Sequence, residues 1–255
     1  MSSAEQAPLL EIKNLTVQFG GLKALSNIAL QLRPGEVVGI IGPNGAGKTT
    51  LFNAISGFVK PQKGEFTLYG EERAWLAPHQ LIGQSLSRTL QGVGLFQDLT
   101  VFENVLAAVE EEKRSTLQNA FLGGSDAQDL ERAHMALENM YCASLEGVKA
   151  SSLSYPDSKR VALARALVTN PKILLLDEPA GGLGAQEIAW MKQLIHNIKV
   201  KTSILLVEHH MDVVMEVCDR IYVLNFGELI AEGTPEQVRN NPAVIAAYLG
   251  SGATA

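Results

Sequence analysis

The chain has 255 residues, of which 46% are hydrophobic, and its formal net charge is −6. This length and composition favour one main α/β domain with a smaller inserted lobe and a sizeable core. The acidic balance argues against a protein that wraps a nucleic-acid backbone, because such binding favours clustered Lys and Arg.

The first part of the chain has the pattern of strands around a glycine-rich segment. Residues 9–19 alternate in part and predict a strand, and residues 24–32 predict a second strand after a Gly-Gly break. The apolar, β-branched run 36–42 predicts a strand that is buried on both faces of a parallel sheet. Apolar residues at helical spacing follow this run and predict a helix that ends at Gly57. Residues 63–70 predict a hairpin strand.

The middle of the chain has the pattern of helices. Residues 100–112 predict a helix with Thr100 as its N-cap and Glu103 as the capping-box partner. Residues 129–141 predict a second amphipathic helix. Together these segments indicate a helical insert over residues 91–157.

After residue 157 the pattern alternates between helices and strands. This alternation argues for a mainly parallel sheet with helices on its faces. The sequence therefore predicts a core formed by residues 1–90 and 158–255, with the insert between them. The expected helices cover residues 159–168, 186–199 and 210–217, and the expected strands cover residues 173–178, 203–208, 220–224 and 228–232.

One segment, residues 42–49, fits the pattern G-x-x-x-x-G-K-[ST]. Glycines let the backbone curl so that successive N–H groups point at phosphate oxygens, and the following helix adds its positive N-terminal end. Lys48 would reach the terminal phosphates, and the Thr49 hydroxyl would ligate Mg²⁺. The alternative is a Gly-rich turn with an incidental Lys, which the predicted flanking strand and helix disfavour. The phosphate-binding residues would be Gly42, Pro43, Asn44, Gly45, Ala46, Gly47, Lys48, Thr49 and Thr50.

A second candidate site is the acidic pair Asp177 and Glu178, which follows an apolar strand. In an open α/β sheet, ligands bind beyond the carboxyl ends of the strands, so the pair would lie near the phosphates. Asp177 would hold Mg²⁺ through water, and Glu178 would polarise the attacking water as general base. The alternative for the pair is a solvated strand end. His209 follows another apolar strand and would donate to the terminal phosphate, although a lone histidine is more often structural.

Other features of the sequence bear on where the protein works. Cys142 and Cys218 lie far apart, so we expect no disulfide scaffold and a reducing compartment. The first residues lack a basic region followed by an apolar run, which argues against a secretory signal. No apolar stretch reaches the roughly 18 residues of a membrane span, so work at a membrane would require docking to another protein.

Together these motifs resemble those of the ABC-type ATPases over about residues 9–250. Their order is GPNGAGKTT, then Gln91 ahead of the insert, then LSYPD before KRVALARAL, then ILLLDEP and VEH. The resemblance implies a P-loop NTPase (RecA-like) core with a mainly parallel sheet, an N-terminal antiparallel β subdomain and an inserted α-helical subdomain. It also implies ATP and Mg²⁺ as cofactors, and hydrolysis of ATP.

The resemblance further implies roles for individual residues. His209 would be the switch histidine that acts with Glu178 and Lys48 in catalysis. Gln91 would contact Mg²⁺ or the attacking water and sense the permease. Phe19 would stack on adenine, and the alternative for it is a core aromatic residue.

Finer features are similar to the ATPases of branched-chain amino-acid importers. The stretches that carry this likeness are SRTLQ, LFQDLTVFENVL and GTPEQVRNNPAVIAAYLG, although ATPases of lipopolysaccharide export have similar endings. The likeness implies a second ABC ATPase subunit, integral membrane permease subunits and a substrate-binding protein as partners, and no nucleic acid. It implies a cytoplasmic protein that is peripheral on the plasma membrane. The rivals are a soluble ABC ATPase without a transport role and a regulatory subunit with little turnover.

In such a protein the insert would pass the motion of the ATP cycle to the permease. Some apolar residues of the insert would line a groove for a permease helix, and the alternative for them is a plain core role. These residues are Phe96, Leu99, Val101, Phe102 and Leu106.

Residues 153–157, LSYPD, depart from the family signature, which is LSGGQ or LSYGQ. In the family this segment caps, in trans, the phosphate that a partner subunit holds. Pro156 has no N–H and Asp157 adds a negative charge near phosphate, whereas Ser154 still has the hydroxyl that would reach phosphate in trans. We therefore expect a heterodimer with one weak site, with a homodimer as the second possibility. The alternative is that Pro156 is tolerated at a helix start, where a missing N–H costs little.

Overall fold

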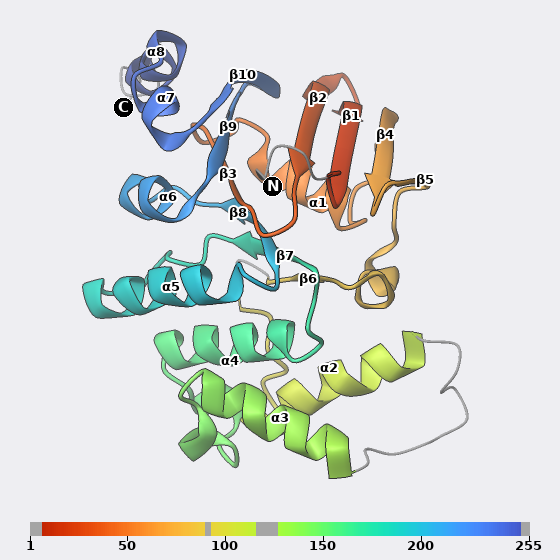
Figure 1. Ribbon diagram of the computed structural model, residues 1–255, viewed down its shortest axis with the longest axis vertical. Coiled ribbons are helices and arrows are strands. Elements are labelled where there is room, and N and C mark those ends of the chain that lie inside the picture. Colours follow the sequence, from red (N-terminus) through yellow and green to blue (C-terminus); the bar gives the residue numbers. More distant parts are fainter. Residues whose placement is uncertain (1–6, 90–92, 116–126, 251–255) are drawn as a thin grey trace.

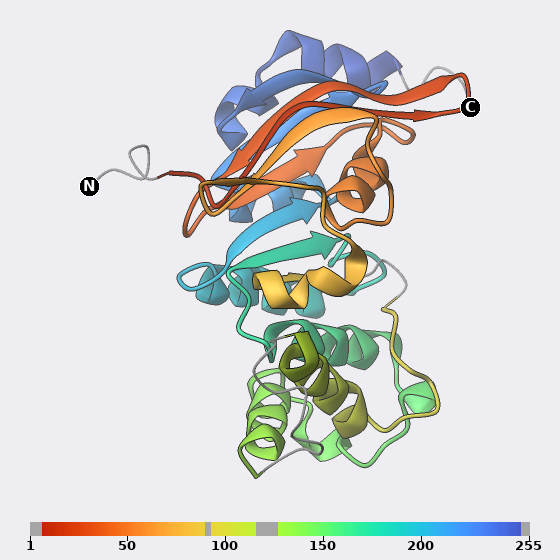
Figure 2. The ribbon, with the colours of Figure 1, turned by 90° about the vertical axis from the view of Figure 1, so that its right-hand side faces the viewer.

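The structure of the protein is a computed structural model that describes residues 7–89, 93–115 and 127–250. The helical part lies at one end of the long axis, and the antiparallel sheet lies toward the other end, beside the carboxyl-terminal strands and helices of a mainly parallel sheet (Figures 1 and 2). Among the described residues, no helix combines the length and the apolar character that a membrane span requires.

The antiparallel sheet has the strand order β2-β1-β4-β5 and corresponds to the predicted N-terminal β subdomain. Strand β2 begins two residues earlier than expected, because Leu22 pairs with Phe19 across the tight turn at Gly20 and Gly21. The strands are β1 (Leu10–Phe19), β2 (Leu22–Leu32), β4 (Lys63–Leu68) and β5 (Glu71–Arg73).

The second sheet has the order β10-β9-β3-β8-β7-β6, and its pairs are parallel except for the edge pair β9–β10. Every residue of β3, β7 and β8 is buried, as expected for strands that are covered on both faces. The three-residue strand β6 was not predicted, since it has no apolar run. The strands are β3 (Val37–Ile41), β6 (Leu86–Arg88), β7 (Ile173–Asp177), β8 (Ser203–Val207), β9 (Arg220–Asn225) and β10 (Glu228–Gly233).

This mainly parallel sheet separates two hydrophobic cores. Successive strand residues point to opposite faces, so Val38 and Ile40 join the core shared with the antiparallel sheet and α1 (Lys48–Ile55). Val37 and Ile41 join the core on the other face. The helices of that second core and of the carboxyl-terminal region are α4 (Tyr155–Leu167), α5 (Ala185–Ile198), α6 (Met211–Val217), α7 (Pro235–Arg239) and α8 (Pro242–Gly250).

The helical part is formed by α2 (Val101–Ser115) and α3 (Ala127–Asn139), which pack against α4 (Figure 1). The predicted capping box is confirmed, because the Glu103 N–H donates to Thr100 Oγ1 at 3.2 Å and the Thr100 N–H donates to Glu103 Oε2 at 2.7 Å. Short 3₁₀ turns complete the connections: η1 (Pro78–Gln80), η2 (Ile82–Gln84), η3 (Ala143–Leu145) and η4 (Ala150–Ser152).

The predicted start of α4 at residue 159 is wrong. The helix begins four residues earlier, with Ser154 as the N-cap whose hydroxyl accepts from the Asp157 N–H. Pro156 lies in the first turn, where a backbone N–H would have no partner within the helix. The expected boundary of the insert at residue 157 therefore falls inside α4, and the division into core and insert remains a prediction.

The apolar residues of the insert divide between core and surface. Val101 is fully buried, and Phe102 and Leu106 pack against the second core, which confirms the core role for these three. Phe96 is exposed, with the Arg165 guanidinium 5.9 Å from its ring centroid.

Candidate functional site

The loop between β3 and α1 is shaped by glycines at positions that a side chain could not occupy. Gly42 has φ of 152°, and a Cβ there would lie 2.1 Å from the Leu224 carbonyl oxygen. Gly47 has φ of 103°, and a Cβ there would lie 2.9 Å from the Ala24 carbonyl oxygen. The loop therefore curls tightly against β9 and β2.

Helix α1 follows this loop, and its N-terminus is suited to bind an anion. Its N-cap is Gly47, so no side chain caps the helix, and its first turn carries no acidic residue. The N–H groups of a helix start lack partners within the helix and, with the helix dipole, favour a phosphate. Thr49 and Asn44 are exposed at this point, whereas Ala46 is buried.

The Lys48 ammonium is held over the loop. Its Nζ donates to the Gly42 carbonyl at 2.7 Å and to the Pro43 carbonyl at 2.9 Å. Burial lowers the pKa of Lys48, and the nearby negative charge of Glu178 opposes that shift. Glu178 of the acidic pair thus lies within electrostatic reach of the phosphate loop, as the sequence predicts.

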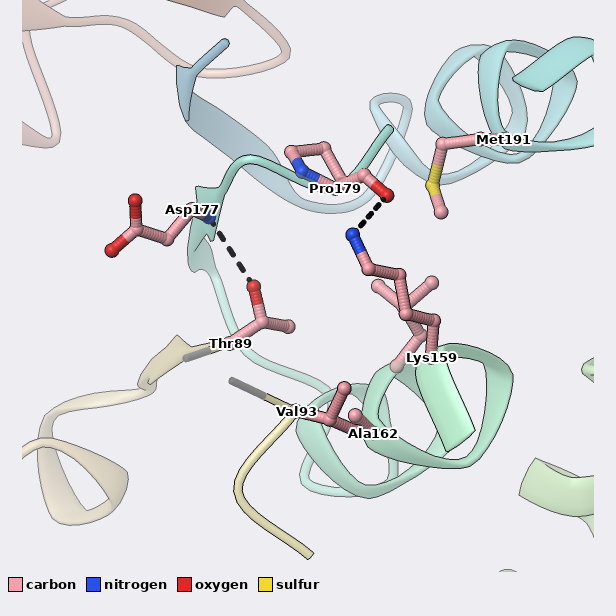
Figure 3. Close-up of a pocket in the computed structure, with 8 residues that line it drawn as sticks. Thr89, Val93, Lys159, Ala162, Asp177, Pro179 and Met191 are labelled. Carbon is pink, nitrogen blue, oxygen red and sulfur yellow. Dashed lines mark hydrogen bonds between the residues drawn. The ribbon is translucent and has the colours of Figure 1, made fainter. Parts of the chain in front are cut away.

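Asp177 ends β7 in a network that the sequence did not reveal. Its Oδ2 accepts from Arg88 Nη2 at 2.7 Å, and both side chains are buried. The backbone N–H of Asp177 donates to Thr89 Oγ1 at 3.3 Å (Figure 3). The same guanidinium donates through Nη1 to Asn53 Oδ1 at 2.8 Å and to Ser56 Oγ at 2.6 Å. Arg88 therefore joins the metal-site candidate to the end of α1.

Glu178 has a left-handed backbone with φ of 48°, which is uncommon for a residue other than glycine. Its N–H still donates to the Val207 carbonyl of β8 at 2.8 Å. Lys159 of α4 donates from Nζ to the Glu178 carbonyl at 2.8 Å and to the Pro179 carbonyl at 2.9 Å, the second of which Figure 3 shows. Burial lowers the pKa of Lys159, and the charges of Glu208 and Glu178 oppose the shift.

His209 lies just beyond β8, beside the acidic pair. Its Nδ1 is 4.0 Å from Glu178 Oε2 and 3.6 Å from the Oε1 of Glu208. Its side chain is largely exposed. Lys48, Asp177, Glu178 and His209 thus follow the carboxyl ends of neighbouring parallel strands, where ligands bind in open α/β sheets.

The remaining predicted site residues have different positions. Phe19 is 51% exposed at the end of β1, so the alternative of a core aromatic residue is wrong. Ser154 caps α4, and its hydroxyl donates to Asp157 Oδ2 at 2.6 Å. Gln91 lies outside the described residues.

Sequence reasoning missed Arg88 and Lys159. Arg88 contacts a residue 89 positions away, and Lys159 contacts carbonyls 19 and 20 positions away. The apolar periodicity around each residue gives no signal for such contacts. Arg88 meets Asp177 because β6 pairs with β7, whereas Lys159 reaches the peptides after β7 from α4.

Comparisons with known proteins agree with this geometry. A family model described as ABC transporter matches residues 25–181, and one described as branched-chain amino acid ATP-binding cassette transporter matches residues 228–254. The chain is 44% identical over 250 residues to the high-affinity branched-chain amino acid transport ATP-binding protein LivG of Salmonella typhimurium. That match covers 95% of this chain and 98% of the relative.

Two further similarities extend this finding. The chain is 33% identical over 243 residues to the lipopolysaccharide export system ATP-binding protein LptB of Haemophilus influenzae, covering 95% of this chain and 97% of the relative. The crystal structure of the ADP conformation of an ATP-binding cassette of an ABC transporter superposes with a TM-score of 0.84 at 31% identity. That superposition covers 96% of this chain and 100% of the other chain.

Proposed function

Because the chain belongs to the family of ATP-binding subunits of ABC transporters, we propose that it energises the import of branched-chain amino acids through a membrane permease. The protein binds nucleotide and is an ATPase of this family. The substrate class is supported by the 44% identity to LivG, compared with 33% for the lipopolysaccharide-export relative. The match of residues 228–254 supports the same class.

The proposed nucleotide site has the triphosphate in the loop of residues 42–50. The N–H groups of the loop and of the start of α1 bind phosphate oxygens, and Lys48 exchanges its two carbonyl partners for the terminal phosphates. Phe19 stacks on adenine at the end of β1. The single observation that supports this assignment best is that Lys48, at the start of α1, lies over the loop within electrostatic reach of Glu178, which follows β7 far away in sequence.

The residues present fit a magnesium ion. Mg²⁺ prefers oxygen ligands and retains several waters. The exposed Thr49 hydroxyl and the Asp177 carboxylate supply such oxygens, and Arg88 bonds Oδ2 of that carboxylate, so the group is held in one orientation. Gln91 would complete this site. The ion would neutralise phosphate charge, while Thr49 and Asp177 position it.

In the proposed reaction Glu178 orients and polarises the attacking water, and His209 contacts the terminal phosphate. The 4.0 Å between His209 Nδ1 and Glu178 Oε2 supports their action on one phosphate group. The alternative to an active ATPase is a regulatory subunit with little turnover, and Pro156 in the signature segment is the residue that favours it. The presence of Glu178 at the strand end beside the phosphate loop favours turnover.

We further propose that the ATPase works as a heterodimer whose two sites differ. The start of α4 supports this proposal, because its groups are already occupied within the chain. The Ser154 hydroxyl donates to the Asp157 carboxylate and accepts from the Asp157 N–H, and Arg160 lies 3.5 Å from the same carboxylate. Pro156 fits the first helical turn, as the alternative expected, but the carboxylate still repels a phosphate.

The partners follow from this proposal. A second ABC ATPase supplies the opposing face, permease subunits anchor the pair at the inner side of the plasma membrane, and a substrate-binding protein delivers the amino acid. The proposal is tested by purifying the tagged chain with its membrane partners and measuring ATP-dependent uptake of leucine, isoleucine and valine in proteoliposomes. Uptake that Glu178→Gln abolishes is expected. Uptake of these amino acids that persists with Glu178→Gln, or no uptake by an assembly that hydrolyses ATP, would refute it.

A further inference from the structure

Three adjacent residues, Glu208, His209 and His210, form a cluster of potential metal ligands beyond the end of β8. One ligand atom from each lies within 4.8 Å of the others. Glu208 is 1% exposed, whereas His209 is exposed and His210 is half-buried. The cluster thus has a buried carboxylate at its base and two imidazoles at the surface.

The Glu208 carboxylate is held in a fixed orientation. Its Oε1 accepts from the backbone N–H groups of His209 and His210, each at 3.2 Å. Its Oε2 accepts from the Ala180 N–H at 3.2 Å. A carboxylate that backbone donors orient in this way is a preorganised metal ligand, because its position does not depend on the metal.

Both imidazoles turn the same nitrogen toward this carboxylate. His210 Nδ1 is 2.7 Å from Glu208 Oε1, and His209 Nδ1 is 3.6 Å from the same oxygen. In a tetrahedral zinc site with bonds of about 2.0–2.1 Å, neighbouring ligand atoms lie about 3.3 Å apart. These two distances differ from that spacing by about 0.6 Å and about 0.3 Å, which small rotations of the two imidazoles cover.

We propose that Glu208, His209 and His210 bind a transition-metal dication of the zinc class, and that this metal inhibits ATP hydrolysis by holding His209. Two imidazoles and one carboxylate are donors that suit zinc, whereas Mg²⁺ takes oxygen ligands. The site is therefore distinct from the magnesium site of the nucleotide. Water, or Glu178 with its Oε2 4.0 Å from His209 Nδ1, completes the coordination.

The inhibitory part rests on the proposed function, and metal binding does not. A metal on Nδ1 fixes the His209 ring with that nitrogen toward Glu208, as it already faces in this structure, and so prevents the ring from turning toward a phosphate in the loop. If Glu178 joins as the fourth ligand, the same metal removes the group that polarises water. Either arrangement lowers the turnover of bound ATP without requiring loss of ATP binding.

A plain hydrogen bond between His210 and the buried carboxylate is the alternative explanation of the geometry. The substitution His210→Asn distinguishes the two, because the Asn amide nitrogen stands near the position of Nδ1 and still donates to Glu208. An amide nitrogen does not ligate zinc. His134→Asn is the matched control, since His134 pairs with Glu146 at 2.8 Å on the surface and the pair offers only two ligands.

The first experiment adds Co²⁺ to the full chain without nucleotide and records the visible absorption of tetrahedral cobalt. We expect one equivalent to bind, Zn²⁺ to displace it, and His210→Asn to weaken binding by at least about tenfold. His134→Asn is expected to bind as the unaltered chain does. No binding by the unaltered chain, or equal binding by His210→Asn, would overturn the site. Thermal melts of each variant with and without Zn²⁺ give a second readout, with a rise expected for the unaltered chain and not for His210→Asn.

The second experiment measures hydrolysis of MgATP by the assembled transporter with added Zn²⁺. The unaltered complex should lose activity, whereas the His210→Asn complex should keep its basal rate and resist the metal. Because zinc also binds ATP, equal inhibition of both complexes would overturn the inhibitory role. An assembly without ATPase activity would count against the proposed function, while the cobalt measurement would still decide the site.

Discussion

The guanidinium of Arg88 donates to the carboxylate of Asp177 at 2.7 Å, and both side chains are buried. Arg88 comes from the three-residue strand β6, and Asp177 ends the neighbouring strand β7. Arg88, on the edge strand of the sheet, therefore fixes the orientation of the Asp177 carboxylate, the proposed magnesium ligand. It also ties that ligand to α1, the helix of the phosphate loop, through Asn53 and Ser56.

Arg88→Ala is expected to destabilise the protein by about 3–5 kcal/mol, because it leaves a buried carboxylate without its partner. Urea unfolding of the unaltered chain and the variant measures this change. Arg73→Ala is the control, since Arg73 pairs with Glu71 on an exposed strand and surface pairs contribute about 0–1 kcal/mol. Equal small losses for the two variants would show that the buried pair does not support the fold.

Lys48→Ala is expected to weaken MgATP binding by roughly tenfold to a hundredfold, the effect of losing a hydrogen-bonded charge of about 1.5–3 kcal/mol. Fluorescent ATP analogues or calorimetry measure the affinity. Lys60→Ala provides a surface lysine of the same charge as control. If the Lys48→Ala chain bound MgATP as tightly as the control, the phosphate-loop assignment would be wrong.

Glu178→Gln is expected to lower ATP hydrolysis by the heterodimer at least about a hundredfold, because general-base catalysis contributes roughly 10²–10⁴-fold. The equivalent substitution in the partner ATPase should have a much smaller effect, since that site would use Ser154 and Asp157 of this chain as its cap. Phosphate release by the two purified heterodimers compares them. Equal losses would argue against two unequal sites.

The two cysteines should resist alkylation in the folded protein. Burial raises the pKa of Cys142 to about 11 and raises the pKa of Cys218 further. The thiolate is the reactive form, so at pH 8 roughly one Cys142 thiol in a thousand is reactive, and the rate should rise about tenfold per pH unit until the pKa is reached. Mass spectrometry after iodoacetamide treatment measures this, with guanidinium-unfolded protein as the control. Rapid alkylation of folded protein at pH 8 would contradict the burial of these thiols.

Local patterns predicted much of the fold. The buried runs of β3, β7 and β8 and the loop of glycines before α1 follow from short-range constraints on side-chain burial and backbone freedom. The start of α4 was misplaced because Pro156 has the pattern of a helix boundary, although a first helical turn accepts it.

The sequence predicts the site residues that belong to a local motif. It does not predict those whose contacts join residues far apart in the chain. Lys48, Asp177 and Glu178 each follow a recognisable strand pattern. Arg88 and Lys159 do not, because their partners are separated from them in sequence: Arg88 meets Asp177 through the pairing of β6 with β7, and Lys159 reaches the peptides after β7 from α4. The role of Gln91 stays a prediction.

The backbone of Glu178 gains its unusual conformation at a cost of about 1–3 kcal/mol, and Lys159 helps to maintain it. Relaxing the peptide after Glu178 would pull its carbonyl from the Lys159 ammonium and leave a buried cation short of an acceptor. The same helix begins at Tyr155, four residues before Lys159, which the sequence pattern alone would have made its first residue. A slide of α4 by one turn, about 5.4 Å, would separate the Lys159 ammonium from the carbonyls of Glu178 and Pro179, so the support of this backbone conformation depends on the register of the helix.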